Sequence, residues 1–523
     1  MRGLSPWPAQ KRRGNGKEGR CLTGKEKRRA ALRIALFLLF LLAVVRLLSF
    51  VTERKESGSR LRPFLRNAKQ YDVLFFGDSH VINGAFPREL WRDWGIPAYN
   101  LASYGNTMPV VYWTMRLALQ YASPQWVVIG VKGVEKDWML TGSSSDLHTA
   151  LDGYPLSPEK LTAILDLTKD PRSTDDEGNP YQQLRWEYLF KLAKYHSRWR
   201  ELTGNDFAPG DNRLLGALNA VSVAVPAEYA PPEEPEPAEE SGVGYEYLRR
   251  MIAECRERGI RVLLVNMPYP AKEEAWEIGE RVRLIAEETD TPFIDFLRLD
   301  SVADYQTDCY DPRSHLNPSG ARKVTAYLGD WLRRRAALPD RRGDPAYARF
   351  QEEDAIWLSD KEELLRGQTQ PDRLLMLLHD PDFSVAFHMS EWAAFGEDDR
   401  LLRLLENISR APVLEADAEE SWSDALWPLS RLNDAAWEGL PYFCLAAQGD
   451  KNPAERIGEE IPGTYDTPSG ALSVSETEKG AIFRLARGGK ETAYLDGEPA
   501  GPYGVSFLIF NRRTGGVVRA GRM

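Results

Sequence analysis

A basic segment followed by a long apolar run constrains the fold of this chain most. Residues 1–33 carry 11 lysines and arginines against 2 acidic residues, and residues 34–51 read IALFLLFLLAVVRLLSFV. This run approaches the roughly 20 residues that span a bilayer as a helix, and its one charged residue, Arg46, can extend toward the interface. Because positive charge stays on the cytoplasmic side, we expect a cytoplasmic tail over 1–33, a transmembrane helix over 34–51 and an extracellular remainder, in a single-pass protein of the cell membrane.

Two other interpretations of the apolar run are a cleaved signal peptide and a buried core helix. No small-x-small cleavage pattern follows the run, and the basic region before it is long for a signal peptide. A buried core helix is disfavoured because the residues that precede the run are strongly basic. The sequence therefore favours a signal anchor that is retained.

Composition excludes several functional classes. At 523 residues, with 43% hydrophobic and 28% charged residues, the chain is expected to form two or more globular domains. A net charge of −10 argues against nucleic acid as the main partner, because phosphate binding needs a clustered basic surface. The cysteines form no CxxC pair and no cluster with histidines, so neither a zinc site, nor another metal site, nor a disulfide framework is expected; they are Cys21, Cys255, Cys309 and Cys444.

From residue 71 onward, short apolar runs alternate with amphipathic stretches, which is typical of α/β proteins. We expect five buried strands, at 72–76, 98–102, 126–131, 261–266 and 292–296. The clearest helices are expected at 108–121, 244–258, 273–288 and 319–335. The pattern predicts a parallel sheet that is covered on both faces and binds ligands at the carboxyl ends of its strands.

The remaining segments divide the chain further. We expect a polar tether over 52–70, an α/β domain over 71–338, a charged strap with short helices over 339–380, and a small β-rich α+β domain over 381–523. Within the α/β domain, the acidic and proline-rich stretch near 225–242 is expected to be a mobile loop. The C-terminal domain should contain strands at 383–389, 442–446, 481–485 and 505–510, a helix near 398–408 and a final hairpin.

The run Gly77-Asp78-Ser79-His80 directly follows the first predicted strand. A serine on such a turn can present its hydroxyl at the sheet edge, but it needs a base, and usually a carboxylate that orients the base, to act as a nucleophile. The chain offers these groups in the stretch 308–320, DCYDPRSHLNPSG, as Asp311 and His315. Asp78 is more readily explained as the N-cap of the next helix than as an acid catalyst.

Together, GDSH after the first strand, Gly105 after the second and HLNPSG before the last helix resemble the SGNH/GDSL hydrolase superfamily. The similarity covers about 71–336 and is greatest to membrane-tethered proteins related to the D-alanine transfer protein and to polysaccharide O-acetylation factors. It implies a flavodoxin-like sheet and a cofactor-free triad of Ser79, Asp311 and His315. It also implies an oxyanion hole made by the backbone N–H groups of Ser79 and Gly105 and by an asparagine side chain.

The chain departs from the family pattern at two places. The family usually has the aspartate three residues before the histidine, where this chain has Pro312; Asp311 stands four before, and Asp308 is the second choice. The Gly-x-Asn-Asp block expected after the third strand is absent, since residues 129–133 read IGVKG. Asn106 is our candidate for the missing donor.

Weaker resemblances concern the rest of the chain. The tract YHSRW at 195–199 is similar to one in envelope members of this branch, so His196 joins His80 and Asp308 as residues expected to line the site. Residues 381–523 resemble the interleukin-like inducer domain, a small module thought to bind carbohydrate or protein.

These features predict a membrane-anchored esterase or O-acyltransferase that acts on acyl groups of a cell-envelope glycan, with a membrane O-acyltransferase as a further partner. The two departures motivate an alternative, a catalytically silent SGNH-fold protein that binds or organises envelope components. A membrane sensor that signals through its basic tail is the third hypothesis.

Overall fold

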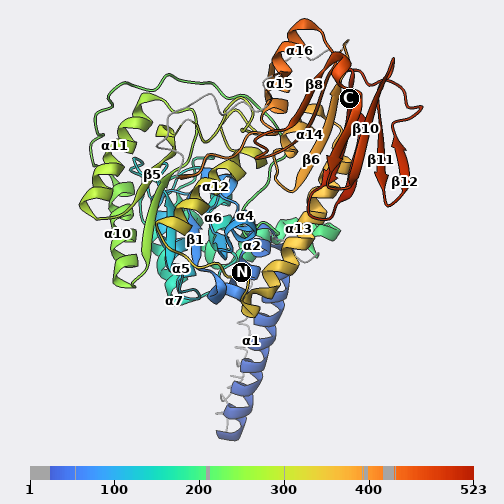
Figure 1. Ribbon diagram of the computed structural model, residues 1–523. Coiled ribbons are helices and arrows are strands. Elements are labelled where there is room, and N and C mark those ends of the chain that lie inside the picture. The colour runs from blue at the N-terminus through green and yellow to red at the C-terminus, as the bar shows by residue number, and fades with distance from the viewer. Residues whose placement is uncertain are drawn as a thin grey trace, which may run out of the picture. The chain divides into compact units, whose positions relative to one another are not determined.

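The computed structural model (Figure 1) describes residues 24–53, 55–207, 213–299, 301–391, 393, 399–415, 429 and 431–523. Most of the predicted basic tail, with Cys21, and the first residue of the helix expected near 398–408 lie outside these residues. The chain divides into two compact units: Met1–Glu53 with Phe190–Phe207, and Arg54–Leu189 with Ala208–Met523. The first is small, and the second carries all three sheets.

The first unit is built on the apolar helix α1 (Gly24–Thr52), whose 29 residues are long and apolar enough to cross a membrane. It starts before the predicted residue 34 because the lysines, arginines and alanines ahead of the apolar run are good helix formers. The short helices α9 (Lys191–Tyr195), η2 (His196–Arg200) and η3 (Gly204–Asp206) complete the unit. An ion pair of 2.9 Å between Lys191 and Glu53 ties them to the end of α1.

The second unit contains the predicted parallel sheet. Its strands are β1 (Val73–Phe76), β2 (Ala98–Asn100), β3 (Trp126–Gly130), β4 (Arg261–Asn266) and β5 (Phe293–Asp295). They lie in the order β2-β1-β3-β4-β5, and every neighbouring pair is parallel. This is the flavodoxin-like order, so the predicted fold class is confirmed.

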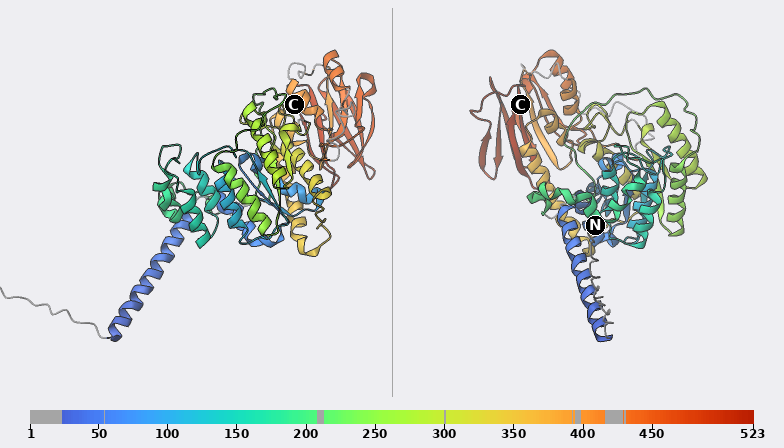
Figure 2. Two further views of the ribbon diagram at one scale, coloured as in Figure 1. Left: turned by 90° about the vertical axis from the view of Figure 1, so that its left-hand side faces the viewer. Right: turned by 180° about the vertical axis from the view of Figure 1, so that it is seen from behind.

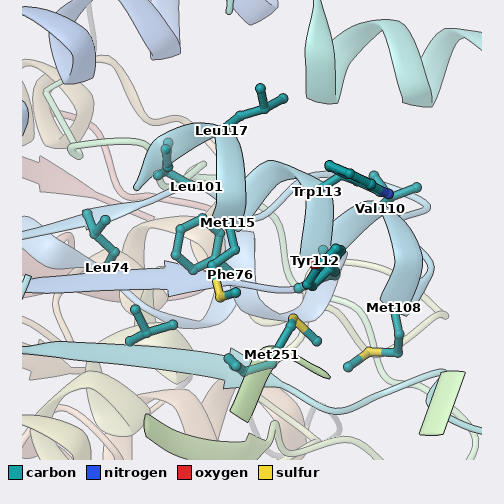
Figure 3. Packing of buried hydrophobic residues seen from close by; sticks show 14 of the residues in the cluster. Leu74, Phe76, Leu101, Met108, Val110, Tyr112, Trp113, Met115, Leu117 and Met251 are labelled. Atoms are coloured by element: carbon teal, nitrogen blue, oxygen red, sulfur yellow. The ribbon is translucent and has the colours of Figure 1, made fainter. Parts of the chain in front are cut away.

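Helices cover both faces of this sheet because successive strand residues point to opposite sides. On one side, Leu74 and Phe76 pack against α5 (Met108–Ala118) and α10 (Val243–Glu257), as Figure 3 shows for the residues around Met251. On the other side, alternate residues of the same strands pack against α3 (Ser79–Gly84), α4 (Pro87–Trp94) and α12 (Pro318–Arg334). Helix α11 (Glu273–Glu288) leads into β5.

The predicted tether and strap are more helical than expected. The predicted tether contains α2 (Lys55–Asn67), because Leu61 and Phe64 share one helix face and are buried in the core around Leu74. The predicted strap contains the 20-residue α13 (Ala348–Gly367), whose buried residues recur at helical spacing, and the short α14 (Pro371–Leu377). The excursion after β3 holds α6 (Ser144–Leu151), α7 (Pro158–Leu167) and α8 (Tyr181–Leu189).

The C-terminal part forms two largely antiparallel sheets, seen from two sides as orange and red strands in Figure 2. One has the order β14-β13-β6-β7-β8 and the other β12-β11-β10-β9. Helices α14, α15 (Asp399–Glu406) and α16 (Leu432–Glu438) cover one face of the first sheet, and the second sheet packs on the opposite face. The strands are β6 (Phe383–Met389), β7 (Tyr442–Ala447), β8 (Ala454–Ile457), β9 (Gly463–Thr467), β10 (Gly470–Thr477), β11 (Gly480–Arg487), β12 (Lys490–Tyr494), β13 (Val505–Asn511) and β14 (Gly516–Arg522).

A buried ion network fastens this C-terminal part to the parallel sheet's helices. Arg322 of α12 contacts Asp380 at 2.8 Å, and Lys361 of α13 contacts the same carboxylate at 2.9 Å. Arg92 of α4 lies 3.1 Å from Asp382. Because each buried charge has a partner of opposite sign, removal of any one would leave an uncompensated charge in the interior.

Candidate active site

The first element of the candidate site is the turn between β1 and α3. Gly77 has φ +154°, and a side chain there would meet Val81 at 2.5 Å, so the chain turns sharply without one. Asp78 caps α3 by accepting a hydrogen bond from the His80 N–H, as predicted for an N-cap. Ser79 is therefore the first residue of the helix, half-buried at the carboxyl edge of the sheet.

The structure brings the three residues of the predicted triad together. His315 Nε2 lies 2.8 Å from Ser79 Oγ, and His315 Nδ1 lies 2.8 Å from Asp311 Oδ2. Since the carboxylate accepts the Nδ1 proton, Nε2 is left to accept the hydroxyl proton of Ser79. This is the geometry that a serine nucleophile requires of its base and of the group that orients the base.

A short hairpin explains how an aspartate four residues before the histidine reaches its ring. Cys309 and Leu316 form an antiparallel bridge, and the Tyr310 N–H donates to the His315 carbonyl at 2.9 Å. Between them, Asp311 Oδ1 accepts the N–H groups of Arg313 and His315, both at 3.1 Å. One carboxylate thus closes the loop with one oxygen and orients the imidazole with the other.

Asp308, the second choice for the orienting role, does not contact the His315 ring. Its side chain is fully buried, with Oδ2 at 2.7 Å from Lys323 Nζ and Oδ1 accepting from Ser319 Oγ at 2.7 Å. Burial acts to raise the pKa of Asp308, but the Lys323 ammonium and these hydrogen bonds outweigh it and lower that pKa. The bridge at Cys309 and Leu316 turns Asp308 to the back of the hairpin, away from the site that it was expected to line.

The predicted oxyanion residues lie in the loop after β2. The Ser103 N–H donates to the Gly77 carbonyl at 3.2 Å, which holds this loop against the Ser79 turn. Gly105 has φ +63°, a backbone conformation that favours glycine. Asn106 is buried, and its Nδ2 donates to the same Gly77 carbonyl at 3.1 Å, so one of its two N–H groups is already used.

His80 takes part in a second relay beside the first. Its ring lies against that of His315 with centroids 4.5 Å apart and the planes tilted by 38°, and its Nδ1 faces Asp78 Oδ2 at 3.3 Å. Its Nε2 lies 2.7 Å from Lys132 Nζ, and the ammonium also lies 3.8 Å from the centre of the Tyr269 ring. The sequence analysis missed Lys132 and Tyr269. Their positions just after β3 and β4, at the edge where Ser79 lies, were the available signal.

Burial and neighbouring charges fix the protonation states of this second relay. Burial lowers the pKa of His80, and the nearby Lys132 and His315 lower it further, against the opposite effect of Asp78. Burial acts to raise the pKa of Asp78, yet His80 and Lys132 outweigh it and lower that pKa to about 2. A neutral imidazole therefore stands between a carboxylate and an ammonium.

His196 belongs to the other compact unit, where its Nδ1 lies 3.0 Å from the Ala193 carbonyl, so its place at the site stays a prediction. Among the residues that the structure describes, no group of three or more His, Cys, Asp or Glu side chains is arranged to hold a metal ion.

The back of the hairpin is held by the C-terminal part of the chain. His379, between α14 and β6, places Nδ1 2.7 Å from Ser319 Oγ, and its Nε2 lies 2.7 Å from the Leu404 carbonyl. Asn407, just after α15, donates to Thr307 Oγ1 at 3.1 Å. The supporting residues are far from the hairpin in sequence: His379 lies 60 positions after Ser319, and Asn407 lies 100 positions after Thr307.

Comparisons with known proteins give little further assignment. No family model matches the chain, and no curated protein is similar enough to count as a relative. Among solved structures, the crystal structure of the lipase/acylhydrolase from Enterococcus faecalis is similar over 51% of this chain and 96% of that chain, with 12% sequence identity and a TM-score of 0.27. At this TM-score the likeness supports no conclusion about activity, so we base the assignment on the geometry around Ser79.

Proposed function

We propose that this protein is a membrane-anchored serine esterase or O-acyltransferase that acts, outside the membrane, on acyl groups of a cell-envelope glycan. The observation that carries the proposal is the relay from Ser79 Oγ through the His315 ring to Asp311, with both contacts at 2.8 Å. No cofactor is needed for this chemistry.

The reaction follows from the positions of these groups. His315 Nε2 takes the hydroxyl proton as Ser79 Oγ attacks the ester carbonyl, and Asp311 stabilises the imidazolium that forms. The backbone N–H groups of Ser79 and Gly105, with the Asn106 amide, are proposed to receive the oxyanion. The imidazolium then gives its proton to the leaving alcohol, and the acyl-enzyme remains on Ser79.

Water or a sugar hydroxyl attacks the acyl-enzyme while His315 again takes the proton, and the imidazolium returns that proton to Ser79 Oγ as the acyl–oxygen bond breaks, which completes the cycle. Attack by water gives an esterase, and attack by a sugar gives a transferase. The apolar helix α1, with basic residues at its start, supports a cytoplasmic N-terminus and an extracellular site. A membrane O-acyltransferase is the partner that we propose as the source of acyl groups.

Covalent labelling tests the proposal directly. The full-length chain in detergent micelles is treated with a fluorophosphonate probe, and labelling is followed by in-gel fluorescence. We expect labelling of the wild type, its loss in Ser79→Ala and its retention in Ser222→Ala, a control serine outside the relay. Absence of labelling of the wild type by several serine-reactive probes would instead favour the silent SGNH-fold binding protein.

Product analysis separates the two enzymatic forms. An unlabelled sample of a preparation that reacts with the probe is given an acetyl ester with and without glycan oligosaccharides. Free acetate and acetylated glycan are then measured. Acetylated glycan that depends on Ser79 identifies a transferase, whereas release of acetate alone identifies an esterase.

A further inference from the structure

A pocket of about 450 Å³ lies next to the hairpin that carries His315. Its walls come from the ends of β3 and β4, from the irregular segment before α10, from the first turns of α11 and from the hairpin itself. The residues that matter here are Lys132, Tyr269, Tyr229 and Pro312–Ser314. The pocket shares the hairpin with the relay, so a molecule bound there can extend toward Ser79.

Lys132 is the half-buried cation in this wall. Its ammonium contacts the Nε2 atom of neutral His80 at 2.7 Å and the face of Tyr269 at 3.8 Å. Within the described ranges of the chain, no carboxylate lies within 4.0 Å of Lys132 Nζ. By contrast, the buried Lys323 and Lys361 each have a carboxylate partner, at 2.7 and 2.9 Å.

An ammonium held away from bulk water without an anion is unusual, because burial of a charge is costly unless it is paired. The Asp78–His80 pair does not supply the missing anion. The Asp78 carboxylate faces His80 Nδ1, and the neutral ring separates it from Lys132. This arrangement fixes the position of the ammonium but leaves it free to attract a negative ligand.

The other charges at the pocket balance one another. Lys272 and Arg313 lie at the rim with Glu135 and Glu274, and all four side chains are exposed to solvent. Exposed pairs are screened and contribute little to selective binding. Asp78 and Asp311 also act electrostatically on Lys132, but neither lines the pocket, so the half-buried Lys132 decides the electrostatic preference of the pocket.

We propose that this pocket binds a carboxylate or phosphate group of the substrate, with Lys132 as its charge partner. The inference rests on the proposed function, since it concerns the substrate of the Ser79 reaction. Ser79 does not line the pocket, so Lys132 is assigned to a permanent anionic group rather than to the oxyanion that develops at the ester.

The anionic group has two sources in an ester. It can belong to the acyl part, as in the half-ester of a dicarboxylic acid, or to the alcohol part, as in an acidic or phosphorylated sugar. Two pairs of test esters distinguish them: 4-nitrophenyl hemisuccinate against 4-nitrophenyl valerate for the acyl part, and 4-acetoxybenzoate against 4-acetoxybenzamide for the alcohol part.

The full-length chain in micelles is assayed with these four esters as wild type and as Lys132→Met. We expect the variant to lower the ratio of kcat/KM for one anionic ester to kcat/KM for its neutral partner by about 10- to 100-fold, mainly through the KM of the anionic ester. Lys132→Arg should retain most of the preference. Lys136→Met removes an exposed lysine of the same loop that does not line the pocket, and it should behave as the wild type.

A binding measurement separates this inference from the proposed function. Titration calorimetry of Ser79→Ala with succinate and with inorganic phosphate should show binding of one of them that weakens about tenfold or more when Lys132→Met is added. The inference is overturned if Lys132→Met lowers kcat/KM equally for anionic and neutral esters, or if neither anion binds. The proposed function is still upheld in that case if the wild type is labelled by the fluorophosphonate. If the anion binds as expected but the wild type is not labelled, the inference is upheld and the proposed function is overturned. If Lys132→Met does not fold, the comparison uses Lys132→Gln.

Discussion

The two carboxylates of the hairpin that carries His315, Asp311 and Asp308, lie three residues apart and have opposite surroundings. The Asp311 side chain keeps 24% of its surface exposed and contacts the ring of His315. The Asp308 side chain is completely buried and contacts Lys323 and Ser319. The front of the hairpin therefore carries the contact from Asp311 through His315 to Ser79, and its back is part of the protein interior.

This difference shows why proximity in sequence is a poor guide to role. A carboxylate beside an imidazole can orient the ring and stabilise a positive charge on it. A carboxylate locked to a buried ammonium is already neutralised and serves the fold. The predictions below test this division between front and back.

Asp311→Asn should have the largest effect, on the front of the hairpin. The amide oxygen can still accept the Arg313 and His315 N–H groups, but the negative charge that orients and stabilises the imidazole is lost. We expect kcat to fall by about 1,000- to 10,000-fold, with the free energy of unfolding changed by less than about 1 kcal/mol. Ester hydrolysis and urea unfolding of the same preparation measure both. Activity within tenfold of the wild type contradicts the assignment.

Asp308→Ala should act on the back and show the reverse pattern. It leaves the Lys323 ammonium buried without its carboxylate, which should cost about 3–5 kcal/mol of stability, while the labelling rate of the folded fraction stays within about threefold. The double variant Asp308→Ala/Lys323→Met removes both charges and should recover much of the loss. If labelling disappears while the free energy of unfolding is unchanged, Asp308 acts on the reaction of Ser79 rather than on the fold.

His379→Gln should remove a pH dependence of stability at the back. Burial, with the nearby Lys323, lowers the pKa of His379 to about 4 in the folded chain. The unfolded chain, with a histidine pKa of about 6.5, binds more protons between these values, so stability falls as the pH is lowered from about 6.5 to 4, by up to about 3 kcal/mol. Glutamine can occupy the same hydrogen bonds without titrating.

Urea midpoints of the wild type and His379→Gln at pH 7, 5.5 and 4.5 measure this effect. The difference between the two proteins, rather than either curve alone, reports His379, because other groups titrate in the same range. Parallel pH curves would rule out the proposed titration.

Asn407→Ala should have the smallest effect. The buried amide donates to Thr307 Oγ1 and, at 3.3 Å, to Asp304 Oδ2 at the base of the hairpin. Its loss should cost about 1–2 kcal/mol and slow labelling by less than about threefold. The exposed Asn452→Ala is the matched control. A labelling rate that falls by much more than threefold, with the expected small loss of stability, would show that the contacts at the back of the hairpin control the position of His315.

Much of the parallel sheet was predictable because its strands are continuous apolar runs separated by amphipathic helices. All five strands lie where the pattern places them, within one or two residues at their ends. The candidate nucleophile and base were also accessible, since Ser79 follows β1 and His315 precedes α12. The direct contact between them joins residues 236 positions apart, which the order of elements alone implies but does not prove.

Other features depend on tertiary contacts that leave little local signal. Strands β9, β10 and β12 were missed because most of their residues are polar. Their few apolar residues, such as Tyr465, Leu472 and Val474, are buried only where the second sheet packs on the first. In the sequence, nothing distinguishes Lys132 from any other loop lysine. Only its contacts with His80 and Tyr269 in the structure do so. His379 and Asn407 support the hairpin from the C-terminal part, and no spacing in the sequence relates them to it.

The hairpin around Pro312 has a consequence for how motifs in other chains are read. The distance in residues between an orienting aspartate and its histidine is a property of the turn that joins them, and this turn, with Ser314 at φ +68°, holds one residue more than the usual pattern. A search that demands one fixed spacing would discard such chains. Allowing an aspartate four positions ahead, when a proline follows it, would retain them.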